Sequence, residues 1–70
     1  MRRFEFVGGS SAKFWELDVQ GKKITVRYGR LGANGQIQTK SFESTEAAQR
    51  HADKLAREKM AKGYVECAVH

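Results

Sequence analysis

The chain has 70 residues, a length that fits one domain and buries only roughly 60 % of the surface that the unfolded chain exposes. Thirteen Lys and Arg against eight Asp and Glu give a net charge of +5, and 40 % of the residues are hydrophobic. These values are typical of a basic globular protein, and the small size argues against a large enclosed active site. The single cysteine, Cys67, excludes an internal disulfide and a zinc site built from paired Cys-x-x-Cys motifs.

No stretch of the sequence approaches the roughly 20 apolar residues that a membrane-spanning helix needs. The short apolar stretch near the N-terminus is interrupted by Gly8-Gly9, before it reaches the length of a signal-peptide core. We therefore expect a cytoplasmic protein without membrane contacts.

Alternation of apolar and polar residues predicts four strands in the first part of the chain. They span residues 3–7, 14–19, 22–28 and 36–42. Within each strand, the side chains expected to share a side are Phe4 and Phe6 in the first, Trp15, Leu17 and Val19 in the second, and Ile24, Val26 and Tyr28 in the third. Glu16 and Asp18 alternate to the opposite side. Asn34-Gly35 predicts the turn before the fourth strand, because both residues accept positive φ.

The periodicity changes at Ser44, which is typical of a helix N-cap, and Glu46 places a carboxylate in the first turn. Apolar residues then recur at helical spacing, at Ala48, Ala52, Leu55, Ala56 and Met60. Gly63 suits a C-terminal stop, so we expect a helix of about 18 residues. Residues 64–69 alternate weakly, and they either form a fifth strand or lie along the sheet.

These elements predict an α+β fold in which a single antiparallel sheet of four or five strands is packed by one long α-helix. The helix must cover one face of the sheet to bury its apolar stripe. Trp15 shares its side with Leu17 and Val19, so we expect it in the core and not in a binding surface. The domain is expected to occupy residues 1–70.

Side chains suited to catalysis are few. Hydrolysis or group transfer needs a nucleophile, a base and an orienting group within reach, whereas His51 lies in the predicted helix, His70 ends the chain and Cys67 stands alone. The glycines of residues 29–35 precede a strand, and a dinucleotide-binding loop precedes a helix; a tight connection explains these glycines better. We expect no enzyme activity, no cofactor, no metal and no small-molecule substrate.

The most informative cluster is Arg27-Tyr28-Gly29-Arg30, with Lys40 on the next predicted strand. Arginine offers a planar fork for phosphate, an aromatic ring stacks on a base or sugar, and glycine permits close backbone approach. Tyr28 also shares its side with Ile24 and Val26, so a place in the core fits the pattern equally well. Spacing alone does not decide between a binding surface and a place in the core.

At these residues the chain resembles the WGR domain, a small module named for a Trp-Gly-Arg motif. The family occurs in DNA-damage-responsive poly(ADP-ribose) polymerases and in stand-alone bacterial proteins. The segments that resemble its bacterial members in order and spacing are residues 14–17, 26–32, 35–36, 39–42, 57–59 and 62–66. The resemblance implies one antiparallel sheet with a single long helix, the same fold that the residue pattern predicts.

The resemblance also implies a function. In the polymerases, the aromatic residue of the motif stacks on a sugar near a DNA 5′ end, and the arginine contacts the terminal nucleotide and a neighbouring domain. Tyr28, Gly29 and Arg30 occupy the three motif positions, and Tyr28 departs from the tryptophan with a smaller flat face. Arg27 and Lys40 are added as phosphate contacts.

The function implied is a non-catalytic nucleic-acid-binding module, which recognises double-stranded DNA ends or nicks with a 5′ phosphate in a DNA damage response linked to ADP-ribosylation. Any interdomain signalling like that of the polymerases would need a separate protein. The alternative is a protein-protein interaction module that uses the same surface, because tyrosine and arginine often carry most of the binding energy of interfaces.

Overall fold

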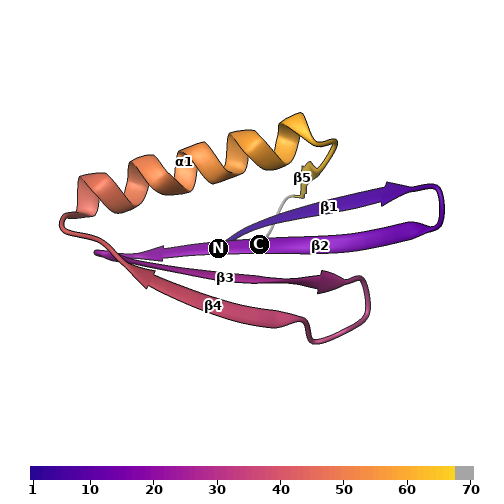
Figure 1. The fold of residues 1–70 in the computed structure, drawn as a ribbon, viewed down its shortest axis with the longest axis horizontal. Coiled ribbons are helices and arrows are strands. Elements are labelled where there is room, and N and C mark those ends of the chain that lie inside the picture. The colour runs from indigo at the N-terminus through magenta and orange to yellow at the C-terminus, as the bar shows by residue number, and fades with distance from the viewer. Residues whose placement is uncertain (68–70) are drawn as a thin grey trace.

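The structure, a computed structural model, describes residues 1–67. These residues form five strands in one antiparallel sheet and one helix that lies over one of its faces (Figure 1). The elements are β1 (Arg2–Gly8), β2 (Ser11–Gln20), β3 (Lys23–Arg30), β4 (Gln36–Ser41), α1 (Thr45–Ala61) and β5 (Val65–Cys67). The predicted α+β fold is confirmed.

The strand order in the sheet is β4-β3-β2-β1-β5. The first four strands follow one another as hairpins, and after α1 the chain returns to add β5 beside β1. The two strands are antiparallel, with Arg3 opposite Cys67, so the weakly alternating C-terminal segment does contain a fifth strand. Residues 68 and 69 of that segment, and the terminal His70, lie outside the described residues.

Helix α1 begins and ends where the sequence predicts. The Ser44 side chain accepts a hydrogen bond from the backbone N–H of Ala47 at 3.0 Å, and the chain leaves the helix at Gly63 with a φ of 101°. The helix has 17 residues against the about 18 expected from periodicity. Within residues 1–67, no helix has the length and apolar character needed to span a membrane.

The core lies between α1 and the sheet. The helix contributes three buried alanines, Ala48, Ala52 and Ala56, and the strands contribute Phe4, Trp15, Leu17 and Ile24. Because alanine is small, the helix can lie close to the large side chains of the sheet. Trp15 is 4 % exposed and its ring lies 5.5 Å from that of Phe4, so the prediction that it belongs to the core is confirmed.

Candidate nucleic-acid interface

Tyr28 and Arg30 lie at the end of β3, on the face of the sheet that carries α1. Their partners on β2 are Trp15 and Lys13, and alternation along β3 turns both side chains to this face. Tyr28 is half-buried against the core, and its hydroxyl donates a hydrogen bond to Gln36 Oε1 at 3.1 Å. Arg30 is exposed and forms no ion pair with any residue in 1–67. Tyr28 thus supports the core and is also partly exposed at the surface.

Arg27 lies on the opposite face of the sheet. Its Nε donates to Glu16 Oε1 at 2.8 Å, and its guanidinium carbon lies 5.3 Å from the centroid of the Phe14 ring. The structure therefore divides the predicted cluster: Arg27 serves an ion pair on the far face, away from Tyr28 and Arg30. The reason is the two-residue period of a strand, which turns neighbouring side chains to opposite faces.

Lys40 shares the face of Tyr28 but lies near the other end of β4. It stands opposite Ile24, whereas Tyr28 stands opposite Gln36, so four residues, or about 13 Å of strand, separate the two positions. Its Nζ lies 5.4 Å from the centroid of the Phe42 ring, at the corner between β4 and α1. The structure does not bring Lys40 next to Tyr28.

Gly29 is required by the loop that follows β3. A Cβ atom at Gly29 would lie 2.9 Å from Gly35 Cα, because residues 31–35 fold back over the end of the strand. Gly35 has a φ of 78°, and a Cβ atom there would meet the Tyr28 carbonyl oxygen at 2.5 Å and the Phe14 ring at 2.8 Å. The missing side chain of Gly29 therefore makes room for the loop that follows it. This agrees with the prediction that these glycines serve a tight connection.

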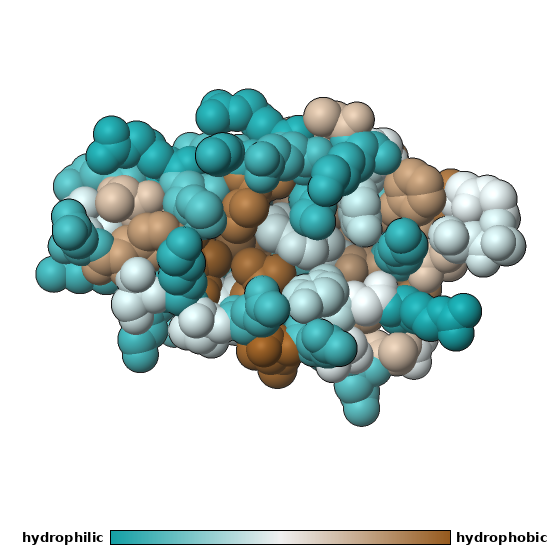
Figure 2. Space-filling view, viewed as in Figure 1, coloured by the Kyte–Doolittle hydropathy of each residue, from teal (hydrophilic) through white to brown (hydrophobic). Residues whose placement is uncertain are grey.

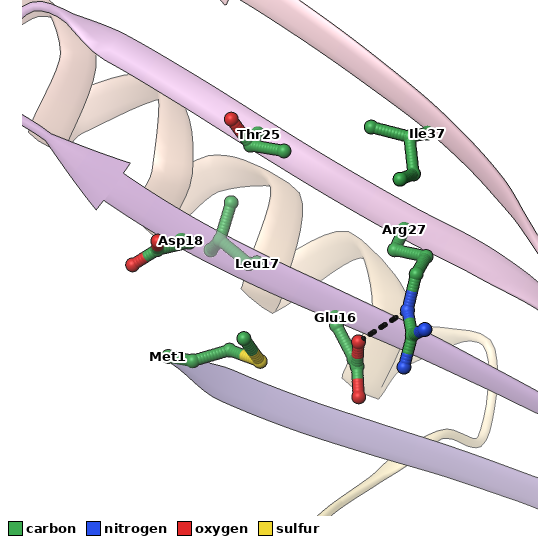
Figure 3. Close-up of a pocket in the computed structure, with 7 residues that line it drawn as sticks. All are labelled: Met1, Glu16, Leu17, Asp18, Thr25, Arg27 and Ile37. Carbon is green, nitrogen blue, oxygen red and sulfur yellow. Dashed lines mark hydrogen bonds and ion pairs between the residues drawn. The ribbon is translucent and has the colours of Figure 1, made fainter.

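The far face of the sheet is organised around the carboxylate of Glu16, a residue that is 8 % exposed. Arg27 donates to one of its oxygens and Arg3 to the other, and the hydrogen bond from Arg27 is the main reason why the pKa of Glu16 is lowered. Figure 3 shows Glu16 and Arg27 facing each other in a shallow hollow on this side of the sheet, bounded by Met1 and Ile37. Both carboxylate oxygens are occupied, so Glu16 acts as a structural anion.

This arrangement predicts a pH-dependent stability. A carboxylate whose pKa is lower in the folded chain contributes stability that is present above its unfolded pKa and is lost as the pH falls through its folded value. The pKa of Glu66 is also lowered, chiefly by the hydrogen bond from Arg2, so it adds to the same loss in acid. We expect Glu16→Gln to lower the free energy of unfolding by about 1.5–3 kcal/mol at neutral pH. The variant should then lose less stability than the parent protein as the pH falls below about 5.

Urea denaturation at pH 7 and pH 3 measures both effects, with Glu43→Gln as the control, since Glu43 is exposed and joins no ion pair in the described chain. A Glu16→Gln variant as stable as the parent at pH 7 would show that the two guanidinium contacts contribute nothing.

A groove lies between α1 and the β3–β4 hairpin, on the same face as Tyr28. Its floor contains Ile24, Val26 and Leu55, and Lys40 and His51 stand at its rim. Figure 2 shows this hydrophobic floor between the hydrophilic residues of the helix and those of the lower strands. His51 is stacked against Phe42, with ring centroids 5.0 Å apart, so it belongs to the packing at this corner.

Groups that hold metals or act as nucleophiles are scarce in the part of the chain that the structure describes. It contains no cluster of three or more His, Cys, Asp or Glu side chains arranged to hold a metal ion. The Cys67 thiol donates only to the Val65 carbonyl, at 3.7 Å. Arg30 and Tyr28 place an exposed guanidinium beside a partly exposed aromatic residue, an arrangement that suits binding of an anion next to a flat group.

Comparison with known proteins agrees with the fold. The chain is 42 % identical over 65 residues to the Escherichia coli K12 protein YfeS, and 41 % identical over 68 residues to the protein YehF of the same strain. These matches take in 93 % and 97 % of this chain but only 27 % and 25 % of the relatives. The chain thus spans about a quarter of their length.

A crystal structure of a Bacteroides fragilis protein superimposes with a TM-score of 0.93 at 48 % identity, over 96 % of this chain and 19 % of that one. The model of the WGR domain family matches residues 1–69. The chain therefore belongs to the WGR domain family.

Proposed function

We propose that this WGR domain is a non-catalytic module that binds DNA ends or nicks carrying a 5′ phosphate, with Tyr28 and Arg30 as its central contacts. The family binds nucleic acid in the poly(ADP-ribose) polymerases, and the two side chains that correspond to its motif lie on one face, next to each other along β3. The observation that carries the proposal is that Arg30 is exposed and forms no ion pair with residues 1–67.

In this mechanism the guanidinium of Arg30 donates two parallel hydrogen bonds to the terminal phosphate. The partly exposed Tyr28 packs its ring on the terminal sugar, and stacking of about 1–3 kcal/mol per base in other systems sets the upper limit for such a contact. The hydrogen bond from its hydroxyl to Gln36 and its packing on the core fix the ring, so little side-chain freedom is lost on binding. Arg27 is not included, because its guanidinium serves Glu16 on the other face.

The test is a fluorescence-anisotropy titration with a blunt duplex that carries 5′ phosphates, at two salt concentrations. Arg30→Ala should weaken binding about 10- to 100-fold, the equivalent of one charge-assisted contact of about 1.5–3 kcal/mol. Arg50→Ala is the matched control, because Arg50 is an exposed arginine in the N-terminal half of α1. Circular dichroism checks that both variants are folded.

Two further ligands separate end recognition from general affinity for DNA. A duplex with 5′ hydroxyl groups lacks the phosphate, and a duplex closed by hairpins at both ends lacks the ends. We expect both to bind more weakly than the phosphorylated duplex. Equal binding of the closed duplex would refute end recognition, and absence of binding at low salt would refute the proposal as a whole.

A protein partner that uses the same face is the second candidate. The observation that favours it is the groove, in which the apolar side chains of Val26 and Leu55 are partly exposed, since exposed apolar surface often marks a site of protein contact. Binding of this kind should depend weakly on salt, whereas the slope of log K against log salt should be about −0.9 for each phosphate contacted on duplex DNA. The salt titration therefore distinguishes the two candidates.

A further inference from the structure

Positive side chains fall into two groups in this structure. All five ion pairs within residues 1–67 use the arginines Arg2, Arg3 and Arg27, which meet Glu5, Glu16, Asp53 and Glu66. No lysine of the described chain takes part in one. The fold thus neutralises three arginines, at the edge near β5 and on the far face, and within residues 1–67 it leaves the lysines and Arg30 without an ion pair.

Lys13 is the neighbour of Arg30 across the sheet. The two residues stand opposite each other on β2 and β3, so their Cα atoms are about 4.5–5.5 Å apart and their side chains share one face. Lys13 is exposed, and its Nζ lies 5.9 Å from the centroid of the Phe6 ring. In the sheet, Lys13 therefore lies much closer to Arg30 than Lys40 does.

Lys59 extends this group of charges towards the helix. Its Nζ lies 5.4 Å from the centroids of both the Trp15 and the Tyr64 rings, and Trp15 is the β2 partner of Tyr28. Burial is the main cause that lowers the pKa of Lys59; the like charges of Lys62 and Lys13 lower it further, and Glu58 opposes them. Lys59 is thus near enough to Lys13 and to Lys62 to be repelled by both.

Aromatic rings hold the ammonium groups of Lys13 and Lys59 without cancelling their charge. Phe6 lies under Lys13 and packs on Tyr64 with ring centroids 5.5 Å apart, and Tyr64 in turn lies under Lys59. A cation over an aromatic face is positioned by the ring but keeps its full charge. A carboxylate partner would have removed that charge from the surface, as Glu16 does for Arg27.

All of these groups lie at one end of the molecule. In Figure 1 this is the end where β3 finishes and where α1 finishes, and β2 starts beside them. The opposite end holds the β4–α1 corner, with Lys40 and Phe42. A cluster of unneutralised lysines beside Arg30 is electrostatically unfavourable in the free protein, and a polyanion that crosses it removes the repulsion.

We propose that the phosphate backbone of the bound DNA strand runs from Tyr28 and Arg30 across β2 to a lysine cluster formed by Lys13, Lys59 and Lys62. This inference rests on the proposed function and adds the path of the strand. It assigns phosphate contacts to three residues outside the motif, and it removes Lys40, which lies about 13 Å along the strand at the other end of the face.

The test compares two double variants that lose the same charge. Lys13→Gln with Lys62→Gln removes the two exposed members of the lysine cluster, and Lys40→Gln with Lys54→Gln removes two exposed lysines elsewhere. With the phosphorylated duplex, the first double variant should bind on the order of tenfold more weakly at 0.1 M salt and should lower the salt slope by about 0.9 per lysine. The second should match the parent protein.

Whenever the parent protein binds the duplex, the outcomes separate this inference from the proposed function. If Arg30→Ala weakens binding and the Lys13/Lys62 variant does not, the strand takes another path and the proposed function stands. If both double variants lose the same affinity and slope, the lysines act only through net charge and the path is refuted. If the parent protein does not bind the duplex, both proposals fail together. Lys59→Gln is a further check, with circular dichroism to confirm folding, because Lys59 also packs on Trp15.

Discussion

Replacing Trp15 by alanine is expected to lower the free energy of unfolding by about 3–5 kcal/mol, the usual cost of removing a large buried aromatic side chain. Trp15 lies at the centre of the sheet, between Phe4 on β1 and Tyr28 on β3 in the register, and it supports Lys59 above it. At about 0.05–0.15 kcal/mol per residue, this loss is a large part of the total stability of so short a chain. Much of the variant should be unfolded at 25 °C.

Urea denaturation followed by circular dichroism measures this effect, since the variant lacks the only tryptophan of the chain. Trp15→Phe keeps most of the buried ring and should be clearly more stable than Trp15→Ala. Val7→Ala is the matched control, because Val7 is 75 % exposed and its truncation should change stability by about 0.5 kcal/mol at most. A Trp15→Ala variant within 1 kcal/mol of the parent would contradict the central packing role of Trp15.

Gly35→Ala should lower the free energy of unfolding by about 2–5 kcal/mol. The positive φ of Gly35 strains any residue with a side chain, by about 1–2 kcal/mol. The new methyl group would also meet the backbone oxygen of Tyr28 and the ring of Phe14, and such overpacking adds about 1–3 kcal/mol. Because Tyr28 belongs to the proposed DNA site, the variant should also bind the phosphorylated duplex more weakly.

Gly32→Ala is the control, because Gly32 also has a positive φ, of 89°, but has open space where the Cβ atom would be. The difference between the two variants isolates the steric contact from the backbone strain. The fluorescence of Trp15 in a urea titration reports unfolding in both proteins. Equal destabilisation of the two variants would show that the loop moves away from Phe14 without cost.

The strands and the helix could be predicted because local patterns decide them. The shared side of Trp15, Leu17 and Val19 set the orientation of β2, and Ser44 with Gly63 set the limits of α1. Phe14 could not be predicted in the same way. By alternation its side chain lies on the side of Glu16 and Asp18, opposite the core. It is nevertheless only 2 % exposed, because a loop and two arginines cover it.

The candidate site was predicted in part. Tyr28 and Arg30 are two residues apart, so strand alternation was enough to place them on one face. The same alternation turns Arg27 away, and the register of β4 moves Lys40 to the far end of its strand. Lys13 was missed because its place beside Arg30 depends on the pairing of β2 with β3. Positions that depend on strand register are not visible in the residue pattern of one strand.

The pairing of β5 with β1 determines how the domain responds to a mechanical load. Three residue pairs join the two strands, from Arg3 opposite Cys67 to Glu5 opposite Val65. A force that pulls residue 2 away from residue 67 acts across this ladder, and it loads the hydrogen bonds one after another from the Arg3 end. Under tension, β5 should therefore detach first by unzipping, while the hairpins that hold Tyr28 and Arg30 remain intact.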